Sequence, residues 1–419
     1  MLEEDAMAPS LEEIRAQFPA IDGDRATGDR FLDAAGGSQI PSVVLNRLTD
    51  FYAGANTQLG AHTANSRRGS ELVGAAHDWL ATWLGVDPER YAVIIGSSAS
   101  ALLSMLSGLV AQSPSSRDEL ILAEAGHESN LGPWLRAGST VRWWDADPKT
   151  GESSLEGLRA LLSDKTRLVA VHQVSNLLGV VEPLEEITAL VHDAGAWVVA
   201  DGVAYAPHRV PRVEEWQVDA YTFSIYKTFG PEIAALAVRW DRLEELPIAN
   251  HEFVERGSSA AFELGGAPRA GSAAVLAVAE YFAFLAGREI PRPGVGLDRA
   301  GVIAAYERMA SLEEPLLERV LADLRSRPGV QLIGPEGEAD RVATLSFTVP
   351  GVKSQTISEA AGERGIGIRS GHFYARRLAE RLGLDPEDGA VRISLVHTNA
   401  PSELEEWENF LDEFAPRIR

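Results

Sequence analysis

Two hydrophobic patterns alternate through the middle of the chain. Short runs of consecutive apolar residues, typical of buried strands, are separated by stretches whose apolar residues recur at helical spacing. The strand-like runs are 91–95, 119–123, 140–144, 167–172, 196–201 and 220–223. Strands that alternate with helices in this way predict a mainly parallel sheet covered by helices. A further apolar run, 234–239, is expected to be an antiparallel return strand.

The regions on either side have different patterns. The helical stretches before the alternation are 9–18, 41–53 and 69–84, and Gly85 is placed to end the last of them. After it, a segment rich in proline and glycine, 287–296, suggests a boundary. The elements expected beyond the boundary are strands at 330–332, 341–348 and 390–395 and helices at 299–326, near 355–364 and at the end of the chain. This mixture predicts a smaller α+β domain.

Net charge and hydropathy limit the partners and the cellular location that we expect for this protein. The formal net charge of −23 opposes binding to nucleic acid and to anionic membrane surfaces. No run of about 18 apolar residues is present, and the chain begins with an acidic cluster rather than an apolar leader. We therefore expect a cytoplasmic enzyme with neither a nucleic-acid nor a membrane partner.

Cysteine is absent from all 419 residues. Its absence excludes disulfides, thiolate metal ligands and a cysteine nucleophile. No metal site is expected from the sequence.

The segment around Lys227 is the first candidate for chemistry. Lys227 follows the run 220–223 among apolar and hydroxyl residues. Burial at a strand end would lower the pKa of a lysine and make its amine nucleophilic, although an isolated lysine is more often a surface residue. The preceding strand candidate ends in Asp201. An amine and a carboxylate after successive strands suit pyridoxal 5′-phosphate, which needs a lysine for its Schiff base and an acid beside its pyridine nitrogen.

Polar residues also follow the other strand candidates. Ser97 and Ser98 lie between a strand and a helix, where N–H groups and hydroxyls can hold a phosphate, although many α/β turns look similar. His127 and Asn176 each follow a later strand, and open α/β sheets bind ligands at the carboxyl ends of their strands. A lone histidine is nevertheless more often structural.

With these pieces placed, the chain resembles the class V aminotransferases of fold type I, on the cysteine-desulfurase side. The resemblance runs from about Phe31 to the final helix and is carried by the Lys227 segment, by Phe31-Leu-Asp-Ala-Ala-Gly-Gly-Ser-Gln-Ile-Pro41 and by Arg369-Ser-Gly-His-Phe-Tyr-Ala375. It implies a large domain over 31–290 with a mainly parallel seven-stranded sheet. It also implies a smaller α+β domain over 291–419, a segment 1–30 packed on that domain, and a homodimer completed by the loop 262–268.

The resemblance assigns a role to each candidate residue. Lys227 would carry the cofactor and remove the substrate α-proton, and Asp201 would pair with the pyridine nitrogen. His127 would stack on the cofactor ring, and Asn176 would contact the ring hydroxyl or the substrate. The phosphate would be held by Ser97, Ser98 and Ser224. The substrate carboxylate would be clamped by Arg392, with Arg369 and His62 nearby, although a surface ion pair is the alternative interpretation of either arginine.

Four positions depart from the desulfurase pattern. Tyr374 stands where the catalytic cysteine is expected, and Ala204 replaces a glutamine or histidine beside the ring hydroxyl. Tyr226 replaces a histidine before the lysine, and Gly266 takes the cofactor-binding position where a threonine often reaches the phosphate of the neighbouring subunit.

These departures shape the expected reaction. Without cysteine no persulfide can form on the protein, so the sequence favours β-elimination of the C–S lyase type. Tyr374 is then a candidate catalytic proton donor or a packing residue of its loop. A class V aminotransferase, an amino-acid racemase or epimerase, and a non-catalytic cofactor-binding module remain alternatives.

Overall fold

The computed structural model describes residues 8–24, 26–335 and 339–417. They form two compact units, each assembled from three stretches of the chain. The first unit contains the described residues of Met1–Arg25, Ser38–Pro114 and Arg209–Arg308. The second contains those of Ala26–Gly37, Ser115–His208 and Met309–Arg419. The domain boundaries predicted after residues 30 and 290 stay predictions.

Three buried strands form the sheet of the first unit. They are β2 (Tyr91–Gly96), β7 (Ala220–Ser224) and β8 (Ala234–Arg239). β8 lies between the other two and runs antiparallel to both, so β2 and β7 run in the same direction. The predicted antiparallel return strand is therefore confirmed.

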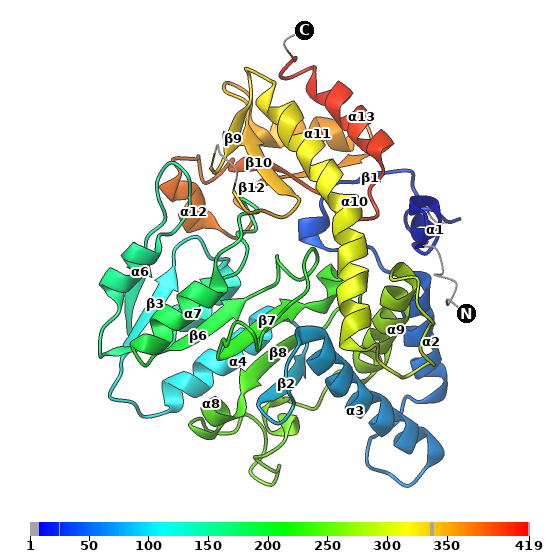
Figure 1. The fold of residues 1–419 in the computed structure, drawn as a ribbon, viewed down its shortest axis with the longest axis vertical. Helices are drawn as coiled ribbons and strands as arrows, with labels where there is room; N and C mark the ends of the chain where they lie inside the picture. Colours follow the sequence, from blue (N-terminus) through cyan, green and yellow to red (C-terminus); the bar gives the residue numbers. More distant parts are fainter. Residues whose placement is uncertain (1–7, 25, 336–338, 418–419) are drawn as a thin grey trace, which may run out of the picture. The chain divides into compact units, whose positions relative to one another are not determined.

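The first unit also contains α-helices (Figure 1). They are α1 (Leu11–Arg15), α2 (Ser42–Gly54), α3 (Ala64–Leu84), α4 (Ala99–Gln112), α8 (Trp240–Glu244), α9 (Arg269–Leu285) and the start of α10 (Arg299–Arg325). α9 is buried along nearly its whole length and packs against α2 and α3. Its small side chains let the neighbouring helices approach, and Trp79 of α3 donates to the carbonyl of Val275 at 3.1 Å.

The third helix begins earlier than its apolar pattern indicates. It starts at Ala64 rather than Gly69, because the Thr63 side chain caps it by accepting a hydrogen bond from the Ser66 N–H. Its first turns are polar and therefore show no helical apolar spacing. Its end is as predicted, with Gly85 in the left-handed conformation at φ +68°.

Four mutually parallel strands form the first sheet of the second unit. In the order β6 (Trp197–Asp201), β5 (Thr166–His172), β3 (Glu119–Ala123), β4 (Thr140–Trp144), each pairs with the next. The accompanying helices are α5 (Gly132–Leu135), α6 (Leu155–Leu161) and α7 (Leu184–Asp193). Parallel pairing brings the carboxyl ends of these strands to one edge, with His172 beside Asp201. Residues that follow the strands therefore share that edge.

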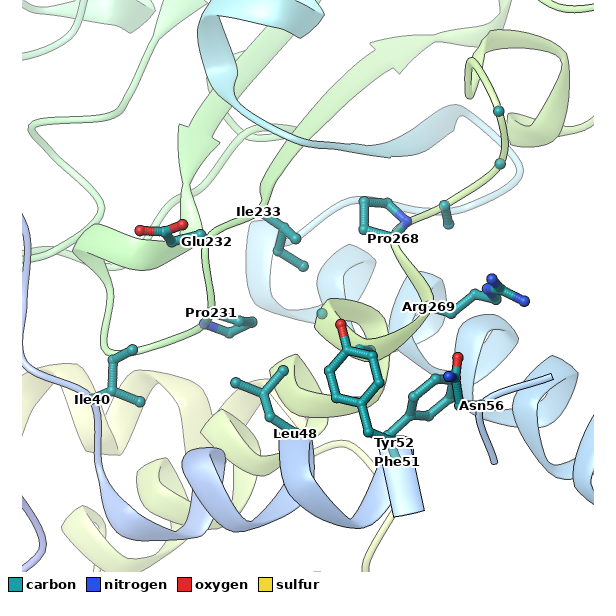
Figure 2. Close-up of a pocket in the computed structure, with 15 residues that line it drawn as sticks. Ile40, Leu48, Phe51, Tyr52, Asn56, Pro231, Glu232, Ile233, Pro268 and Arg269 are labelled. Atoms are coloured by element: carbon teal, nitrogen blue, oxygen red, sulfur yellow. The ribbon is translucent and has the colours of Figure 1, made fainter. Parts of the chain in front are cut away.

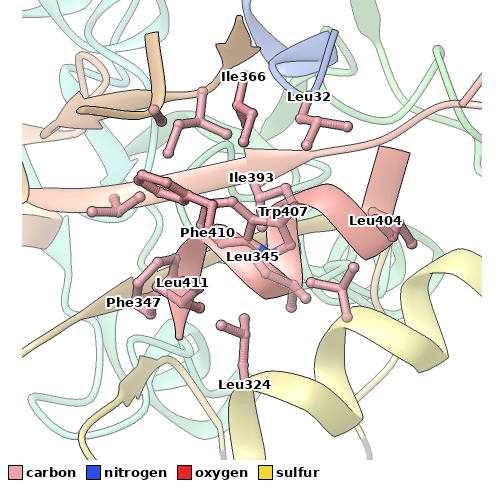
Figure 3. Close-up of a cluster of buried hydrophobic side chains, with 14 of the residues drawn as sticks. Leu32, Leu324, Leu345, Phe347, Ile366, Ile393, Leu404, Trp407, Phe410 and Leu411 are labelled. Carbon is pink, nitrogen blue, oxygen red and sulfur yellow. The ribbon is translucent and has the colours of Figure 1, made fainter. Parts of the chain in front are cut away.

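A second, antiparallel sheet completes this unit. Its order is β12 (Arg369–Gly371), β13 (Ala390–Ser394), β10 (Thr344–Thr348), β9 (Gln331–Ile333). The helices here are α11 (Ser354–Gly362), α12 (Arg376–Arg381), α13 (Pro401–Leu411) and the end of α10, and β1 (Arg30–Phe31) pairs in parallel with β11 (Ile366–Gly367). Figure 3 shows the core between sheet and helices, where Phe347 and Ile393 meet Trp407 and Phe410 of α13.

The α/β part contributes three strands to the first unit and four to the second. Together with the antiparallel sheet of the C-terminal part, this confirms the predicted α/β architecture. Short elements such as α5, α8 and α12 were not predicted, because fewer than two turns carry little periodic signal. Across the described residues, no helix combines the length and the apolar character needed to cross a membrane.

Candidate active site

Lys227 lies in a tight turn directly after β7. The strand ends at Ser224, and Ile225–Lys227 form a single 3-10 turn. The sequence contains four lysines, Lys149, Lys165, Lys227 and Lys353. All four are described, and Lys227 is half-buried whereas the other three are exposed. The lysine predicted as the nucleophile is thus the one that the protein partly shields from water.

The turn after β2 lies on the same sheet edge as Lys227. Gly96 at the end of β2 and Ser224 at the end of β7 both pair with Ala234, from opposite sides of β8. Ser97 and Ser98 follow Gly96 directly. The structure therefore brings the predicted phosphate turn and the predicted nucleophile to one edge of the first unit.

The N-terminus of helix α4 lies at this turn. Ser98 is its N-cap, and the Ser98 hydroxyl accepts a hydrogen bond from the Ala101 N–H at 3.1 Å. The remaining N–H groups of a first helical turn have no acceptor within the helix, and the helix dipole favours negative charge beside them. Ser97 is exposed next to this helix start, and Ser224 is buried at the end of β7. This edge fits a phosphate group.

Asp201 ends β6 in the second unit and is 5% exposed. Its Oδ1 accepts a hydrogen bond from the Val203 N–H at 3.0 Å, and its carbonyl accepts one from the Gln173 N–H at 2.8 Å. A buried carboxylate therefore stands at the carboxyl end of a parallel strand, as the sequence predicts. Ala204 is half-buried in the turn that follows.

His127 follows β3 at the same edge of the second unit. Its Nδ1 accepts a hydrogen bond from the Ser129 N–H at 3.0 Å and lies 2.7 Å from the Ser129 hydroxyl, which together fix the ring. The ring centroids of His127 and Tyr374 lie 5.3 Å apart, with 44° between the ring planes. These two candidates, predicted from distant segments, therefore contact each other.

Arg392 is the most constrained of the substrate-binding candidates. It is 2% exposed, its Nη2 donates to Asp33 Oδ1 at 2.7 Å, and its Nη1 donates to the carbonyl of Asn176 at 3.1 Å. The guanidinium lies 4.0 Å from the ring centroid of Phe373. Burial lowers the pKa of Arg392, while the charge and hydrogen bond of Asp33 oppose that shift. Within the described residues, the buried Nε of Arg392 has no hydrogen-bond partner.

Arg369 lies directly opposite Arg392 in the antiparallel pair of β12 and β13. Its side chain is 58% exposed, and its Nε is 3.8 Å from Asp33 Oδ2. Two guanidinium groups thus flank one carboxylate, which leaves the cluster with a single net positive charge. One further carboxylate, such as that of an amino acid, would neutralise it.

Asn176 is engaged with the loop that follows β12. Its Nδ2 donates to the carbonyl of Phe373 at 2.7 Å. Phe373 and Tyr374 in this loop have φ values of +50° and +59°, rare for aromatic residues. The Tyr374 carbonyl accepts from the Glu128 N–H at 2.8 Å, and its side chain is exposed. The predicted roles of Asn176 at the cofactor and of Tyr374 as a proton donor stay predictions.

The two remaining candidates lie in exposed loops of the first unit. His62 precedes α3, and its carbonyl accepts a hydrogen bond from Arg67 Nη1 at 2.5 Å. Gly266 has φ +84° and lines a cavity of about 700 Å³ together with Tyr52, Pro268 and Arg269 (Figure 2). A threonine would be strained at that φ, and the predicted role of Gly266 at the cofactor stays a prediction.

Two contributors to the arginine cluster were missed at the level of sequence. Asp33 and Phe373 both belong to segments that carry the resemblance, yet neither was expected to touch Arg392. Asp33 and Arg392 are separated by 359 positions, so only the folded chain shows their pairing. Among the described residues, no group of three or more histidine, aspartate and glutamate side chains could hold a metal ion.

Comparison with protein families gives this geometry its context. The family model for aminotransferase class-V matches residues 30–290 and 298–407. The chain belongs to the aminotransferase class-V family. Enzymes of this family depend on pyridoxal 5′-phosphate, and the cofactor of this protein is therefore pyridoxal 5′-phosphate.

Individual relatives extend over almost the entire chain. The aminotransferase-like protein FGM3 of Gibberella zeae is 35% identical over 412 residues, which cover 95% of this chain and 96% of that protein. A probable cysteine desulfurase of Pseudomonas aeruginosa is 30% identical and covers 97% and 98%. Among solved structures, the apo cysteine desulfurase of Thermococcus onnurineus has a TM-score of 0.77 at 22% identity, with 97% and 99% of the two chains covered. That structural likeness confirms the fold.

The residues present fit the cofactor. A half-buried lysine and a helix N-terminus share one edge of the first unit, and a buried aspartate ends a parallel strand of the second. An amine, an anion site and an acid are the groups that pyridoxal 5′-phosphate requires of a protein.

Proposed function

We propose that this class V enzyme cleaves the β-substituent from an amino acid, as a C–S lyase or a lyase of another β-substituted substrate. The observation that carries this proposal is a substitution within a retained loop. The loop after Arg369, where desulfurases have their cysteine, presents the exposed side chain of Tyr374, and the chain has no cysteine anywhere. A sulfur group released from the substrate would therefore leave as a small molecule rather than as a protein persulfide.

Recognition of the amino acid is assigned to the arginine cluster. The substrate carboxylate would be recognised by the guanidinium of Arg392, and Arg369 would supply the second positive charge. Asp33 and Phe373 hold the guanidinium in place for this contact. A charge-assisted contact in a buried setting gives both affinity and orientation.

Proton transfer is assigned to Lys227. The cofactor would supply the electron sink that makes the substrate α-proton acidic, and Asp201 would pair with its pyridine nitrogen. The Lys227 amine would take that proton, and the departing β-substituent would carry the electron pair away. Hydrolysis of the remaining three-carbon fragment would yield pyruvate and ammonia. His127, fixed by Ser129, would cover one face of the ring.

Transamination is the second candidate, favoured by the aminotransferase-like relative from Gibberella zeae. A transaminase would return the proton to the cofactor and release an intact 2-oxo acid. A second oxo acid would then be needed to complete each catalytic cycle.

One incubation separates the two reactions. S-substituted cysteines are added without any oxo-acid acceptor, and pyruvate is followed over many turnovers. Steady pyruvate formation is the expected result. A single stoichiometric burst that an added oxo acid restarts would overturn the lyase in favour of the aminotransferase.

We further propose that the protein is a homodimer whose subunits meet at the loop 262–268. Glu263 anchors the base of this loop, because its Oε1 lies 2.7 Å from His77 Nε2 and accepts from the Ile95 N–H at 2.9 Å. The next residue, Leu264, is 66% exposed and would be covered by the second subunit at such an interface. Light scattering at micromolar concentration is expected to give twice the chain mass. An active protein with the mass of one chain would refute the proposal.

A further inference from the structure

The turn that carries Lys227 is held by a residue from the N-terminal part of the chain. Ser38 lies 188 positions before Tyr226, yet its hydroxyl donates to the Tyr226 carbonyl at 3.0 Å. The hydroxyl oxygen of Ser38 also accepts a hydrogen bond from the Phe229 N–H at 2.8 Å. The Ser38 N–H adds a third bond, to the Tyr226 carbonyl at 3.2 Å. One side chain therefore connects the backbone on both sides of Lys227.

The residue at the far end of this bridge has an unusual backbone. Phe229 has φ +66°, a left-handed conformation that costs a bulky residue on the order of 1–3 kcal/mol. Such a conformation persists when its surroundings determine it. Here the Phe229 ring is buried, with its centroid 6.2 Å from that of Phe18 and 6.0 Å from that of Tyr281, while Ser38 takes its N–H.

The rest of the turn is closed from within. The carbonyl of Ile225 accepts hydrogen bonds from the Thr228 N–H at 2.9 Å and from the Gly230 N–H at 3.1 Å. These local bonds fix the shape of the turn but do not tie it to another segment. Ser38 supplies hydrogen bonds that tie it to the segment before α2, where Phe18 also packs against the Phe229 ring.

We propose that Ser38 is a positioning residue for Lys227. The lysine amine sits on a flexible four-carbon stem, so its reach is set by where the Cα is held. A displacement of about 1 Å between reacting groups can cost on the order of a hundredfold in rate. By fixing Tyr226 and Phe229 together, the Ser38 hydroxyl fixes the Cα of Lys227 that lies between them. This inference rests on the proposed role of Lys227 but not on which substituent leaves.

A matched pair of variants isolates the hydroxyl. Ser38→Thr keeps the oxygen and adds a methyl group, whereas Ser38→Val has nearly the same shape and lacks the oxygen. Ser38→Ala serves if the valine variant does not fold, because it adds no bulk and leaves the backbone N–H bond in place. Ser113→Ala is the control for a general loss of stability, since it removes a hydroxyl that donates to the Glu245 carbonyl at 2.8 Å elsewhere in the same unit.

The first readout needs no cofactor and no reaction. Amide hydrogen exchange is measured on the cofactor-free protein at Phe229. Loss of one hydrogen bond is expected to speed this exchange about tenfold in Ser38→Val, with Ser38→Thr within about twofold of the parent. Equal rates of amide exchange at Phe229 in the valine and threonine variants would show that the Ser38 hydroxyl does not hold this backbone.

The second readout is the kinetics of the loaded enzyme. Ser38→Val is expected to lower kcat about 10- to 100-fold with KM within about threefold, because substrate recognition is left intact. Ser38→Thr is expected to keep kcat. If Ser113→Ala lowers kcat as much at the same loss of Tm, Ser38 has only a structural role. If Lys227 proves not to bind the cofactor, the proposed function fails, whereas the exchange result at Phe229 is unaffected.

Discussion

The two basic side chains at the centre of the proposed chemistry are held in opposite ways. Lys227 is fixed through its backbone, by the Ser38 bridge and the bonds to the Ile225 carbonyl, on a stem that can turn. Arg392 is fixed at its charged head, by Asp33, the Asn176 carbonyl and the Phe373 ring. A side chain that must change partners and move a proton needs a fixed backbone and a terminal group that can move. A side chain that recognises one carboxylate needs a terminal charged group that is held in place.

Removing the mobile amine gives the largest expected effect. Lys227→Ala is expected to lower exchange of the substrate α-proton with solvent deuterium by about 1,000-fold or more, because the variant loses its general base. The measurement is the NMR signal of the α-proton in deuterated buffer. Retained exchange in the variant would show that another group moves the proton.

Truncating the recognition group should change a different kinetic constant. Arg392→Ala is expected to raise KM for amino acids by roughly 30-fold to several thousand-fold, from a loss of about 2–5 kcal/mol in a buried charged contact. Arg392→Lys keeps the charge but loses the planar fork and serves as the comparison.

Amines without a carboxylate provide the control for that prediction. Their kcat/KM is expected to change little, since they make no contact with the guanidinium. Equal losses for amines and amino acids would make Arg392 a structural residue.

Removing the charged partner of the Arg392 guanidinium should also raise KM, but by less than removing Arg392 itself. Asp33→Asn removes the charged partner but keeps the shape, and it is expected to raise KM about tenfold through the loss of one charge-assisted hydrogen bond. Steady-state kinetics measure the change, and kcat should stay within about threefold. A fall in kcat with unchanged KM would contradict the assignment of Asp33 to recognition.

The smallest expected effect concerns a charged pair that supports the Lys227 edge. Burial opposes protonation of His77, but the hydrogen bond and charge of Glu263 outweigh it and raise the pKa of His77 above 6.5. Because the folded-state pKa is the higher one, the stabilising contribution is complete below about pH 6.5 and is lost as pH rises through the folded-state pKa.

The free energy of unfolding of the parent and of His77→Gln measures this contribution. Their difference is expected to shrink as pH rises from about 6 to about 9. A difference that is constant across this range would mean that His77 does not titrate with folding. Glu263→Gln removes the group that raises the pKa of His77, so the loss of stability between about pH 6 and pH 9 should disappear in that variant too.

The Lys227 turn and the Arg392 cluster also differ in how much of each could be predicted from the sequence. Lys227 and Asp201 were found because each follows an apolar strand, and a strand end is visible in the local pattern. Asp33, Phe373 and Ser38 act through partners that lie far away in the chain. Their contacts depend on the register of β12 and β13 and on the path of the segment before α2, and no local pattern encodes either.

The proposed chemistry requires that the cofactor binds to Lys227. Reduction of the loaded protein with borohydride fixes the cofactor to its lysine, and peptide mass spectrometry then locates it among the four lysines of the chain. The predicted result is a single label on Lys227, the half-buried lysine of the turn after β7. A label on Lys149, Lys165 or Lys353 would show that another lysine binds the cofactor and that Lys227 does not have the proposed role.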